Sequence, residues 1–282
     1  MTLSTAPLLL LGVGMVGEAI IAAAESRKIY GTSRDPLKML VLAQMNVEPI
    51  VMPLPSAEII AHVANGAQVV VTYPPDGKTD AVLAPACANA ESIVYVSTTG
   101  VYGSYRGVVT EETSVDAANE SHMPRLNAED VWRDQGAIIL RAPGIYGPKY
   151  GLHKRLLEGT YKLPGDGTGI TSRIQVEDLA RIILAALDSN KRSETYVVGD
   201  LAPTSQREVV TWLCEKLDLP FPESAQLEEV SPTLRGSRSV DASKALKEFG
   251  ITLKFPTYAE GFADAIKRFR SEKQDEKIVG AE

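Results

Sequence analysis

The stretch "LLLLGVGMVGEAI", residues 8–20, decides the fold of the first half of this chain. Four leucines run into Gly12, Gly14 and Gly17, which have the spacing G-x-G-x-x-G. A loop of this kind binds the pyrophosphate of a dinucleotide when a buried strand precedes it, a helix follows it and a second strand lies within about thirty residues. The sequence provides all three, so it predicts a dinucleotide site. The alternative is a glycine-rich turn into a packed helix, with no ligand.

Each position of the loop has a geometric role. Gly12 permits the tight turn, Gly14 lets backbone N–H groups approach the pyrophosphate, and Gly17 lets the helix and the strand pack closely. The N-terminus of the helix, which begins near Met15 and Val16, supplies positive potential for the phosphates. We therefore predict that all five of these residues help to bind the cofactor.

The residues at the end of the second strand choose between NAD and NADP. A carboxylate there binds the ribose hydroxyls of NAD, whereas a cation pairs with the 2′-phosphate of NADP. Asp35 is followed by Pro36, which suits a helix cap. We therefore predict that Ser33 and Arg34 cradle the 2′-phosphate, because a guanidinium matches phosphate in a bidentate way. NADP(H) is the predicted cofactor and NAD(H) the alternative, in which case Arg34 is a solvated loop arginine.

Short apolar runs alternate with amphipathic stretches through the first half of the chain. This alternation is typical of an α/β fold in which a parallel sheet is covered by helices on both faces. The sequence predicts a Rossmann-type doubly wound parallel sheet. Strands are expected at 7–12, 28–33, 46–52, 67–73, 92–98 and 136–143, and helices at 16–26, 35–45, 56–65, 79–90 and 125–134.

The second half of the chain is less regular, and it predicts a smaller C-terminal substrate lobe. We expect the dinucleotide-binding domain to span residues 1–147, joined by roughly 171–200, and the lobe to span 148–170 and 201–270. Within the second half, helices are expected at 153–159, 176–189 and 205–220, a strand at 194–200 and a loop at 222–238. Residues 271–282 are charged, have no apolar face and are expected to fray.

Charge and cysteine content exclude several classes of function. The 282 residues carry a formal net charge of −7 without a basic block, which argues against binding to nucleic acid or to a membrane surface. No apolar run approaches the length of about eighteen residues that a membrane span needs. Cys87 and Cys214 lie far apart without metal-ligand spacing, so we expect no metal site and two reduced thiols in a cytoplasmic protein. The expected partner is a small-molecule substrate.

Several further motifs resemble one family of enzymes. They are "YVSTTGVYG" at 95–103, "TEET" at 110–113, "LRAPGIYGP" at 140–148 and "SRIQVEDLARII" at 172–183. In their order and over nearly the whole chain, they resemble the extended and atypical short-chain dehydrogenases, the NAD-dependent epimerase/dehydratase group. The resemblance is specific for the family and says little about the substrate.

The resemblance implies roles for residues around the cofactor. Thr98 matches the family's Ser/Thr that hydrogen-bonds the substrate oxygen, although it could instead cap the end of the fifth strand. Pro143 matches the residue beside the nicotinamide. Thr72, Tyr73 and Pro74 match the loop that passes under the cofactor.

The resemblance also implies a substrate contact. Arg173 matches a position that often faces the substrate cleft of the family. Its alternative is a structural ion pair with the neighbouring Glu177 or Asp178.

The chain departs from the family where the family does its proton chemistry. Family members carry Tyr-x-x-x-Lys with a glutamate four residues after the lysine; the tyrosine is the acid/base, and the lysine lowers its pKa and holds the ribose. When Glu129 is aligned with that glutamate, Arg125 takes the lysine position and Ser121 the tyrosine position. Arg125 can still bind ribose. A serine hydroxyl is far less acidic than a phenol, so Ser121 is expected to be a helix cap, with Pro124 in the first helical turn.

Other proton donors can be named but not ranked from one sequence. Tyr146 and Tyr150 follow the sixth strand, where the family builds its substrate cleft. His122 and His153 are within reach by sequence, and either is more simply explained as a surface residue.

Two functions follow from this mixture of matches and departures. The first is an atypical NADP(H)-dependent oxidoreductase or epimerase/dehydratase-like enzyme that acts on a small carbonyl or sugar-like substrate. The second is a non-catalytic NADP(H)-binding redox sensor. The second lobe favours the enzyme, because a sensor needs no substrate cleft, and the missing Tyr-Lys pair favours the sensor. On balance we expect the enzyme.

Overall fold

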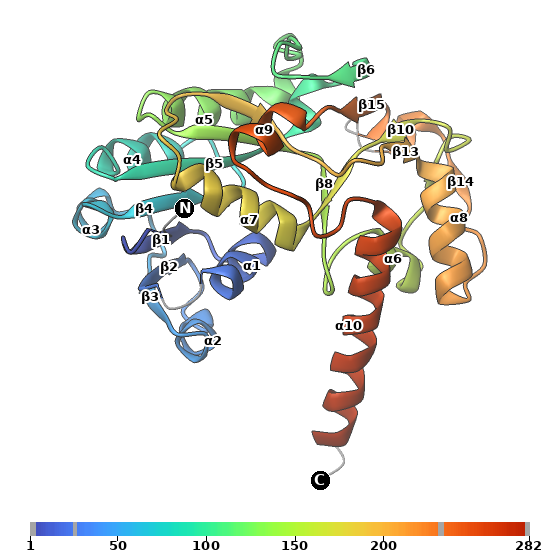
Figure 1. The fold of residues 1–282 in the computed structure, drawn as a ribbon, viewed down its shortest axis with the longest axis horizontal. Helices are drawn as coiled ribbons and strands as arrows, with labels where there is room; N and C mark the ends of the chain where they lie inside the picture. Colours follow the sequence, from blue (N-terminus) through green and yellow to red (C-terminus); the bar gives the residue numbers. More distant parts are fainter. Residues whose placement is uncertain (1–3, 25–26, 231–233, 280–282) are drawn as a thin grey trace.

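The computed structural model describes residues 4–24, 27–230 and 234–279. Its core is a sheet of seven parallel strands in the order β12-β7-β5-β4-β1-β2-β3 (Figure 1). These strands are β1 (Leu8–Leu11), β2 (Ile29–Ser33), β3 (Val47–Val51), β4 (Gln68–Val71), β5 (Ser92–Thr98), β7 (Ile138–Ala142) and β12 (Thr195–Val197). The chain starts in the middle of the sheet and moves outward on both sides, which is the topology of a doubly wound fold. The prediction of a Rossmann-type parallel sheet is therefore confirmed.

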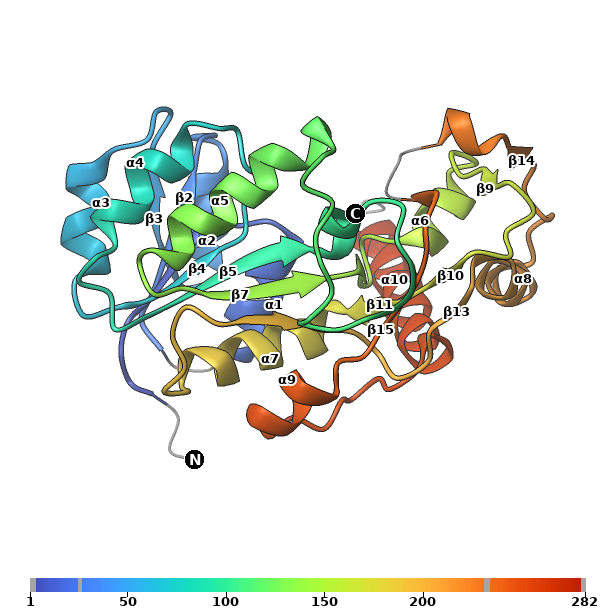
Figure 2. The ribbon, with the colours of Figure 1, turned by 90° about the horizontal axis from the view of Figure 1, so that it is seen from above.

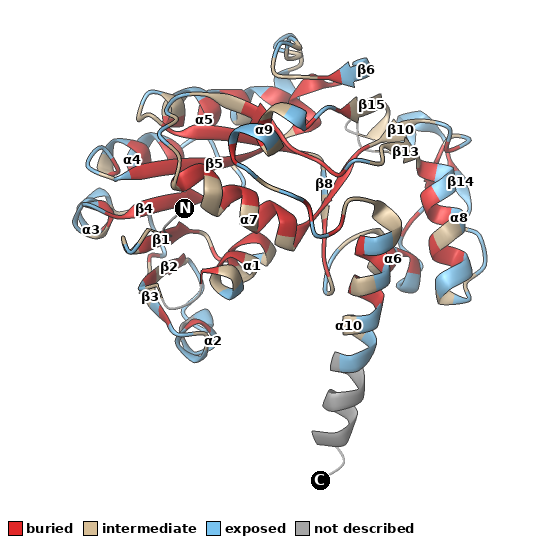
Figure 3. Ribbon diagram, in the orientation of Figure 1, coloured by how far each residue is buried: buried red, intermediate tan, exposed pale blue. Residues whose placement is uncertain are grey.

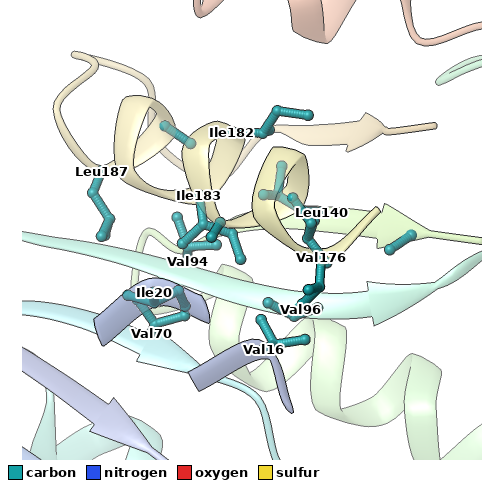
Figure 4. Packing of buried hydrophobic residues seen from close by; sticks show 14 of the residues in the cluster. Val16, Ile20, Val70, Val94, Val96, Leu140, Val176, Ile182, Ile183 and Leu187 are labelled. Carbon is teal, nitrogen blue, oxygen red and sulfur yellow. The ribbon is translucent and has the colours of Figure 1, made fainter. Parts of the chain in front are cut away.

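Helices cover both faces of the sheet. They are α1 (Met15–Ala23), α2 (Lys38–Gln44), α3 (Ala57–Ala64), α4 (Thr79–Ala86), α5 (Met123–Arg133) and α7 (Val176–Leu187). Figure 2 shows α3, α4 and α5 together on one face and α7 on the other. On the α7 face, Figure 4 shows Val16 and Ile20 of α1 and Ile183 of α7 packed against the sheet. The last two residues of the helix predicted at 16–26 lie outside the described residues.

The burial of β1 explains its sequence. All four leucines are fully buried (Figure 3). Successive side chains of a strand point to opposite faces. Leu8 and Leu10 accordingly belong to the core under α1 and α7, and Leu9 and Leu11 to the core under α3, α4 and α5. A continuous apolar run is what a strand covered on both faces requires.

A second group of elements lies beyond the carboxyl ends of the strands (Figure 2). Its core joins buried aromatic and aliphatic side chains such as Tyr146, Leu163, Leu213 and Phe262. The remaining helices are α6 (Leu152–Leu157), α8 (Gln206–Leu217), α9 (Ser243–Glu248) and α10 (Tyr258–Val279), with single turns η1 (Thr99–Tyr102), η2 (Glu120–His122) and η3 (Leu227–Glu229). The remaining strands are β6 (Arg106–Val109), β8 (Gly144–Tyr146), β9 (Leu163–Pro164), β10 (Ile170–Thr171), β11 (Arg173–Gln175), β13 (Thr204–Ser205), β14 (Ser224–Ala225) and β15 (Ser237–Val240). The exact division into domain and lobe stays a prediction.

Two expectations about the second half need adjustment. The segment predicted as a loop at 222–238 holds β14, η3 and the start of β15, and β15 pairs in parallel with β6. Residues 231–233 of that segment lie outside the described residues. The helix α10 extends to Val279 and so includes part of the stretch 271–282. Fraying of that stretch stays a prediction, and its last three residues lie outside the described part of the chain.

Candidate active site

The glycine loop has the geometry of a phosphate cradle. Gly12 has φ = +89°, a conformation that favours glycine, and an added Cβ would lie 3.1 Å from Cβ of Tyr73. At Gly17 an added Cβ would lie 3.2 Å from Cγ1 of Val13, so the glycine permits close packing of helix on strand. At Gly14 no atom lies within 4 Å of an added Cβ. The backbone is therefore open to a ligand at Gly14 alone among these three glycines.

The loop forms one wall of a groove of about 280 Å³ at the carboxyl ends of β1, β2 and β4. We call it the cofactor groove. The residues that line it are Gly12, Val13, Gly14, Thr32, Ser33, Arg34, Lys38, Met52, Pro55, Thr72, Tyr73, Pro74, Thr79 and Leu83. The loop is tied to its neighbours, because Thr72 Oγ1 donates to the carbonyl of Gly12 at 2.6 Å and Gly12 N donates to Thr32 Oγ1 at 2.8 Å. The first turn of α1 follows the loop and contains Met15, Val16 and Gly17, which do not line the groove.

The charged residues of the groove are both cations. Arg34 and Lys38 line it, and none of the described lining residues is an aspartate or a glutamate. Asp35 is engaged elsewhere, since its Oδ1 accepts a hydrogen bond from Leu37 N at 2.9 Å in the turn before α2. The prediction that Asp35 caps this helix is wrong, because the N-cap of α2 is Leu37 and Asp35 closes the turn two residues before it. Arg34 Nη2 lies 3.1 Å from Oδ2 of Asp76.

A larger pocket of about 420 Å³ lies at the carboxyl ends of β5 and β7. We call it the arginine pocket. It is lined by Thr98, Thr99, Gly100, Pro143, Gly144, Ile145, Tyr146, Gly151, Leu152, Arg155, Tyr161, Ile170, Thr171, Ser172, Arg173, Gln206, Leu234, Gly236, Arg238, Val240 and Phe262. The structure thus brings Thr98, Pro143, Tyr146 and Arg173, four of the predicted site residues, into one pocket.

Three guanidinium groups border this pocket, and no carboxylate is among its described lining residues. Arg173 is 7% exposed and donates to the carbonyl and Oγ1 of Thr171, so it makes no ion pair with Glu177 or Asp178. Arg238 donates to the carbonyl of Gly103. Burial lowers the pKa of both arginines, yet a guanidinium stays protonated in proteins.

Thr98 is both a cap and a candidate substrate contact. Its Oγ1 accepts a hydrogen bond from Gly100 N at 3.0 Å, which begins η1. The hydroxyl accepts in this bond, so its own hydrogen is available to a substrate oxygen. The two interpretations of Thr98 are therefore compatible.

Tyr146 stands between the pocket and the core of the lobe. Its ring stacks on Phe262 with 4.1 Å between centroids, and its hydroxyl is buried without a hydrogen-bond partner among the described residues. Burial, and then the nearby Asp200, raise the pKa of Tyr146. A phenol this hard to ionise can donate a hydrogen bond but is poorly suited to act as a base.

Comparison with known proteins identifies the family. The model of the NAD dependent epimerase/dehydratase family matches residues 8–199. The chain belongs to this family. A comparison with curated proteins gives no match.

Solved structures of the same fold include a protein of unknown function, a dehydratase and an epimerase. A functionally unknown conserved protein from Silicibacter pomeroyi DSS is 26% identical with a TM-score of 0.79, and the match covers 95% of this chain and 99% of that one. A dTDP-glucose 4,6-dehydratase from Bacillus anthracis, in complex with NAD, is 20% identical with a TM-score of 0.78 and coverages of 96% and 98%. A UDP-glucuronic acid 4-epimerase from Bacillus cereus, also with NAD, is 17% identical with a TM-score of 0.76 and coverages of 94% and 99%. Their likeness to this chain is a likeness of fold.

The epimerase/dehydratase family's acid/base position is displaced from both pockets in this chain. Ser121 is exposed and lines neither pocket, and its hydroxyl donates to Oδ1 of Asn119 at 2.7 Å. The prediction that Ser121 caps the helix is wrong: Asn119 caps η2 by accepting from Ser121 N. The single turn η2 precedes α5 and shifts the start of that helix to Met123, with Pro124 in its first turn.

Arg125, at the family's lysine position, makes a contact in the core. Its Nη1 donates to the hydroxyl of Tyr95 at 2.9 Å and to the carbonyl of Val96 at 3.4 Å. It lines neither pocket in the described part of the chain. Contact of Arg125 with a ribose stays a prediction.

Glu129, at the family's glutamate position, joins α5 to the sheet. It is 1% exposed, and Oε2 accepts from Nη2 of Arg141 at 2.6 Å while Oε1 accepts from Oγ of Ser97 at 2.5 Å. Arg141 also donates to the hydroxyl of Tyr102 at 3.1 Å. This network lies under the pocket and is structural.

Both candidate histidines are buried, so the expectation that they are surface residues is wrong. His153 is fully buried against Phe262, with Nε2 3.2 Å from the carbonyl of Pro148. Burial lowers its pKa. His122 is 6% exposed, and its Nδ1 lies 3.3 Å from the carbonyl of Asp116. Neither lines the cofactor groove or the arginine pocket, and the exposed Tyr150 lines neither of them either.

Sequence reasoning missed several lining residues, and only one left a signal. Lys38 begins α2 only four residues after Arg34, so its closeness in sequence to the predicted phosphate-binding residues is that signal. Arg155, Tyr161 and Arg238 reach the pocket from elements whose packing no local pattern reveals. In the described residues no helix has the length and apolarity of a membrane span, and no cluster of side chains suits a metal ion.

Proposed function

We propose that this protein is an atypical NADP(H)-dependent oxidoreductase or epimerase/dehydratase-like enzyme that acts on an anionic, sugar-like carbonyl substrate. The proposal rests on one observation: the cofactor groove and the arginine pocket both lie at the carboxyl ends of the strands of the central sheet. The cofactor groove contains the glycine loop and two cations, and the arginine pocket contains three more. Ligands of doubly wound folds bind at this edge.

The groove supports NADP(H) over NAD(H). NAD sites of this fold place a carboxylate against the ribose hydroxyls, and none of the described lining residues supplies one. Ser33, Arg34 and Lys38 instead offer a hydroxyl and two cations. The related dehydratase and epimerase structures contain NAD, so NAD(H) is the alternative.

The arginine pocket supports a substrate with negative charge. A guanidinium binds carboxylate or phosphate oxygens in a bidentate way, and the pocket offers the buried Arg173 and the exposed Arg155. Related structures are described as acting on UDP-glucuronic acid or dTDP-glucose, which are anionic sugar nucleotides. We infer a sugar-like substrate whose anionic part faces Arg173, Arg155 and Arg238.

The bound cofactor would exchange a hydride with the substrate carbon. Thr98 would donate its hydroxyl hydrogen to the substrate oxygen, since Gly100 N already fixes the Oγ1 position. Pro143 would shape the wall beside the reacting carbon, and Arg173, held by Thr171, would fix the anionic end. Fixing both ends of the substrate lowers the entropy cost of reaching the reactive geometry.

The cofactor part is tested with Arg34→Ala, titrated with NADPH and with NADH by calorimetry. Loss of a guanidinium that pairs with phosphate should weaken NADPH binding by about ten- to a hundredfold, or about 1.5–3 kcal/mol. NADH has no 2′-phosphate, so its affinity should change little. A wild-type protein that prefers NADH, or equal effects on both cofactors, contradicts the proposal.

A non-catalytic NADP(H) sensor is the second candidate, favoured by the exposed position of Ser121 outside both pockets. A panel of anionic ketoses and sugar nucleotides, followed by the absorbance of NADPH, separates the two. An oxidoreductase oxidises NADPH with at least one of them, whereas an epimerase or dehydratase returns the hydride, leaves the absorbance unchanged and is detected by NMR of the altered sugar. Either rate falls with Thr98→Val. A sensor binds NADPH with no turnover on any of them. Cys87 and Cys214 are buried and unpaired, which supports a cytoplasmic location for either function.

A further inference from the structure

Two loops that border the cofactor groove are joined by an ion pair. Arg34 follows β2 on one side of the groove, and Asp76 lies on the other side, in the loop between Pro74 and Thr79. Nη2 of Arg34 and Oδ2 of Asp76 are 3.1 Å apart. The side chain that we expect to hold the 2′-phosphate is therefore already paired with a carboxylate.

Asp76 is held in place by hydrogen bonds, whereas the side chain of Arg34 is largely exposed. Oδ1 of Asp76 accepts from Lys78 N at 3.0 Å and from Thr79 N at 2.7 Å, and Oδ2 accepts from Thr79 Oγ1 at 2.6 Å. These hydrogen bonds, the one from the Thr79 hydroxyl foremost, lower the pKa of Asp76 well below its usual range, so the carboxylate stays charged. Arg34 is a long side chain that is 63% exposed. A ligand that recruits Arg34 must draw the guanidinium toward itself, and Asp76 stays behind.

We propose that Asp76 determines cofactor specificity, as an internal counter-ion that competes with the 2′-phosphate of NADP(H) for Arg34. The inference rests on the proposed NADP(H) site. Asp76 and the phosphate carry like charges and share one guanidinium, so the carboxylate weakens NADP(H) binding. NAD(H) has an uncharged hydroxyl at this position, so it does not compete with Asp76 for the guanidinium. Asp76 thus reduces the ratio of NADP(H) affinity to NAD(H) affinity that Arg34 creates.

The test is Asp76→Asn, because asparagine keeps an Oδ1 acceptor for Lys78 N and Thr79 N in the turn before α4 and removes the charge. Wild type and variant are titrated by calorimetry with NADPH, NADH and 2′,5′-ADP, which carries the 2′-phosphate without the nicotinamide half. The variant should bind NADPH and 2′,5′-ADP about two- to fivefold more tightly, in the range of exposed ion pairs, with NADH unchanged. The gain should shrink at high salt, because exposed charges are screened.

Glu48→Gln is the matched control. Glu48 forms an exposed ion pair with Lys28, also at 3.1 Å, near the start of β3 and so at the opposite edge of the sheet. Its loss changes the net charge by the same amount and should leave all three affinities unchanged. If thermal melting shows that asparagine destabilises the fold, Asp76→Ser replaces it, because a serine hydroxyl can also accept from backbone N–H groups near the start of a helix.

Each outcome has a definite meaning. Unchanged or weaker binding of 2′,5′-ADP to Asp76→Asn overturns the inference, and so does an equal gain for NADH. In an Arg34→Ala background the gain from Asp76→Asn should be smaller, because only like-charge repulsion remains; an equal gain contradicts competition for the guanidinium. If wild type binds NADH more tightly than NADPH, the proposed function fails, while a selective gain for 2′,5′-ADP still supports the role of Asp76.

Discussion

At the scale of single residues, the open space over Gly14 sets this position apart. A side chain at Gly12 would be strained by its positive φ and would crowd Tyr73, and one at Gly17 would press on Val13. At Gly14 the backbone is extended, with φ = −114°, and a side chain would enter the cofactor groove. No contact within the protein therefore requires a glycine at position 14.

Gly14→Val should abolish binding of NADPH and NADH and leave the fold intact. The branched side chain fills the space that the pyrophosphate needs, and it meets no protein atom. Calorimetric titration and thermal melting measure the two effects. Gly12→Ala is the contrast, because strain there should lower the melting temperature as well. Wild-type affinity in Gly14→Val would place the cofactor elsewhere.

Ser121→Ala should change the free energy of unfolding by less than about 0.5 kcal/mol, as for other exposed positions, and should leave any turnover unchanged. Asn119→Ala, which removes the cap of η2, should cost about 0.5–2 kcal/mol. Chemical denaturation of both variants checks this order. A hundredfold drop in rate for Ser121→Ala, with fold and cofactor binding preserved, would make the serine a general acid–base catalyst.

At the scale of elements, a buried ion pair between Glu129 and Arg141 joins α5 to the sheet. Burial alone would lower the pKa of Arg141, but its hydrogen bonds with Glu129 outweigh that effect and raise it. The pair holds the carboxyl ends of β5 and β7, from which Thr98 and Pro143 reach the arginine pocket. We therefore expect this pair, which bonds Ser97 next to Thr98, to support the wall of the pocket.

Glu129→Gln should lower the free energy of unfolding by about 3–5 kcal/mol, because it leaves the buried Arg141 charge without its partner. Asp130→Asn, which breaks an exposed ion pair on the same helix, is the control and should cost less than about 1 kcal/mol. Urea denaturation measures both. Similar values for the two variants would show that the buried pair contributes no more than a surface pair.

At the scale of the whole molecule, Asp200 lies where the central sheet gives way to the lobe. It follows β12, its N–H donates to the carbonyl of Arg173 at 2.7 Å, and its Oδ2 is buried without a hydrogen-bond partner among the described residues. Burial raises the pKa of Asp200 to about 6, although the nearby Arg173 opposes the shift. Ionisation of the Asp200 carboxyl group therefore lowers the free energy of unfolding.

Asp200→Asn should become more stable than wild type as the pH rises from 4 to 8. The unfolded pKa is about 3.9, so between about pH 4 and about pH 6 the native state binds more protons than the unfolded chain, and wild-type stability falls with pH. Asparagine cannot ionise. The difference in unfolding free energy between variant and wild type should grow by about 2–3 kcal/mol over this range, measured by denaturation at each pH. A constant difference, or one that grows toward low pH, would contradict the raised pKa.

The sequence by itself determined the sheet and the cofactor loop, because both depend on short-range patterns. The run Leu8–Leu11 must be buried on both faces, and Gly12, Gly14 and Gly17 can be read without knowing what surrounds them. Helix alternation then predicted a parallel, doubly wound order, since parallel strands need crossovers.

Only the tertiary structure decided which side chains meet. Asp76 reaches Arg34 across 42 positions of sequence, and Arg238 enters the pocket because β15 pairs with β6. The burial of His153, the cap at Asn119 and the exposure of Ser121 depend on how η2 and α6 pack. Such contacts join residues far apart in the chain through short, irregular segments. No periodicity marks those segments, so their partners are set by packing over the whole molecule.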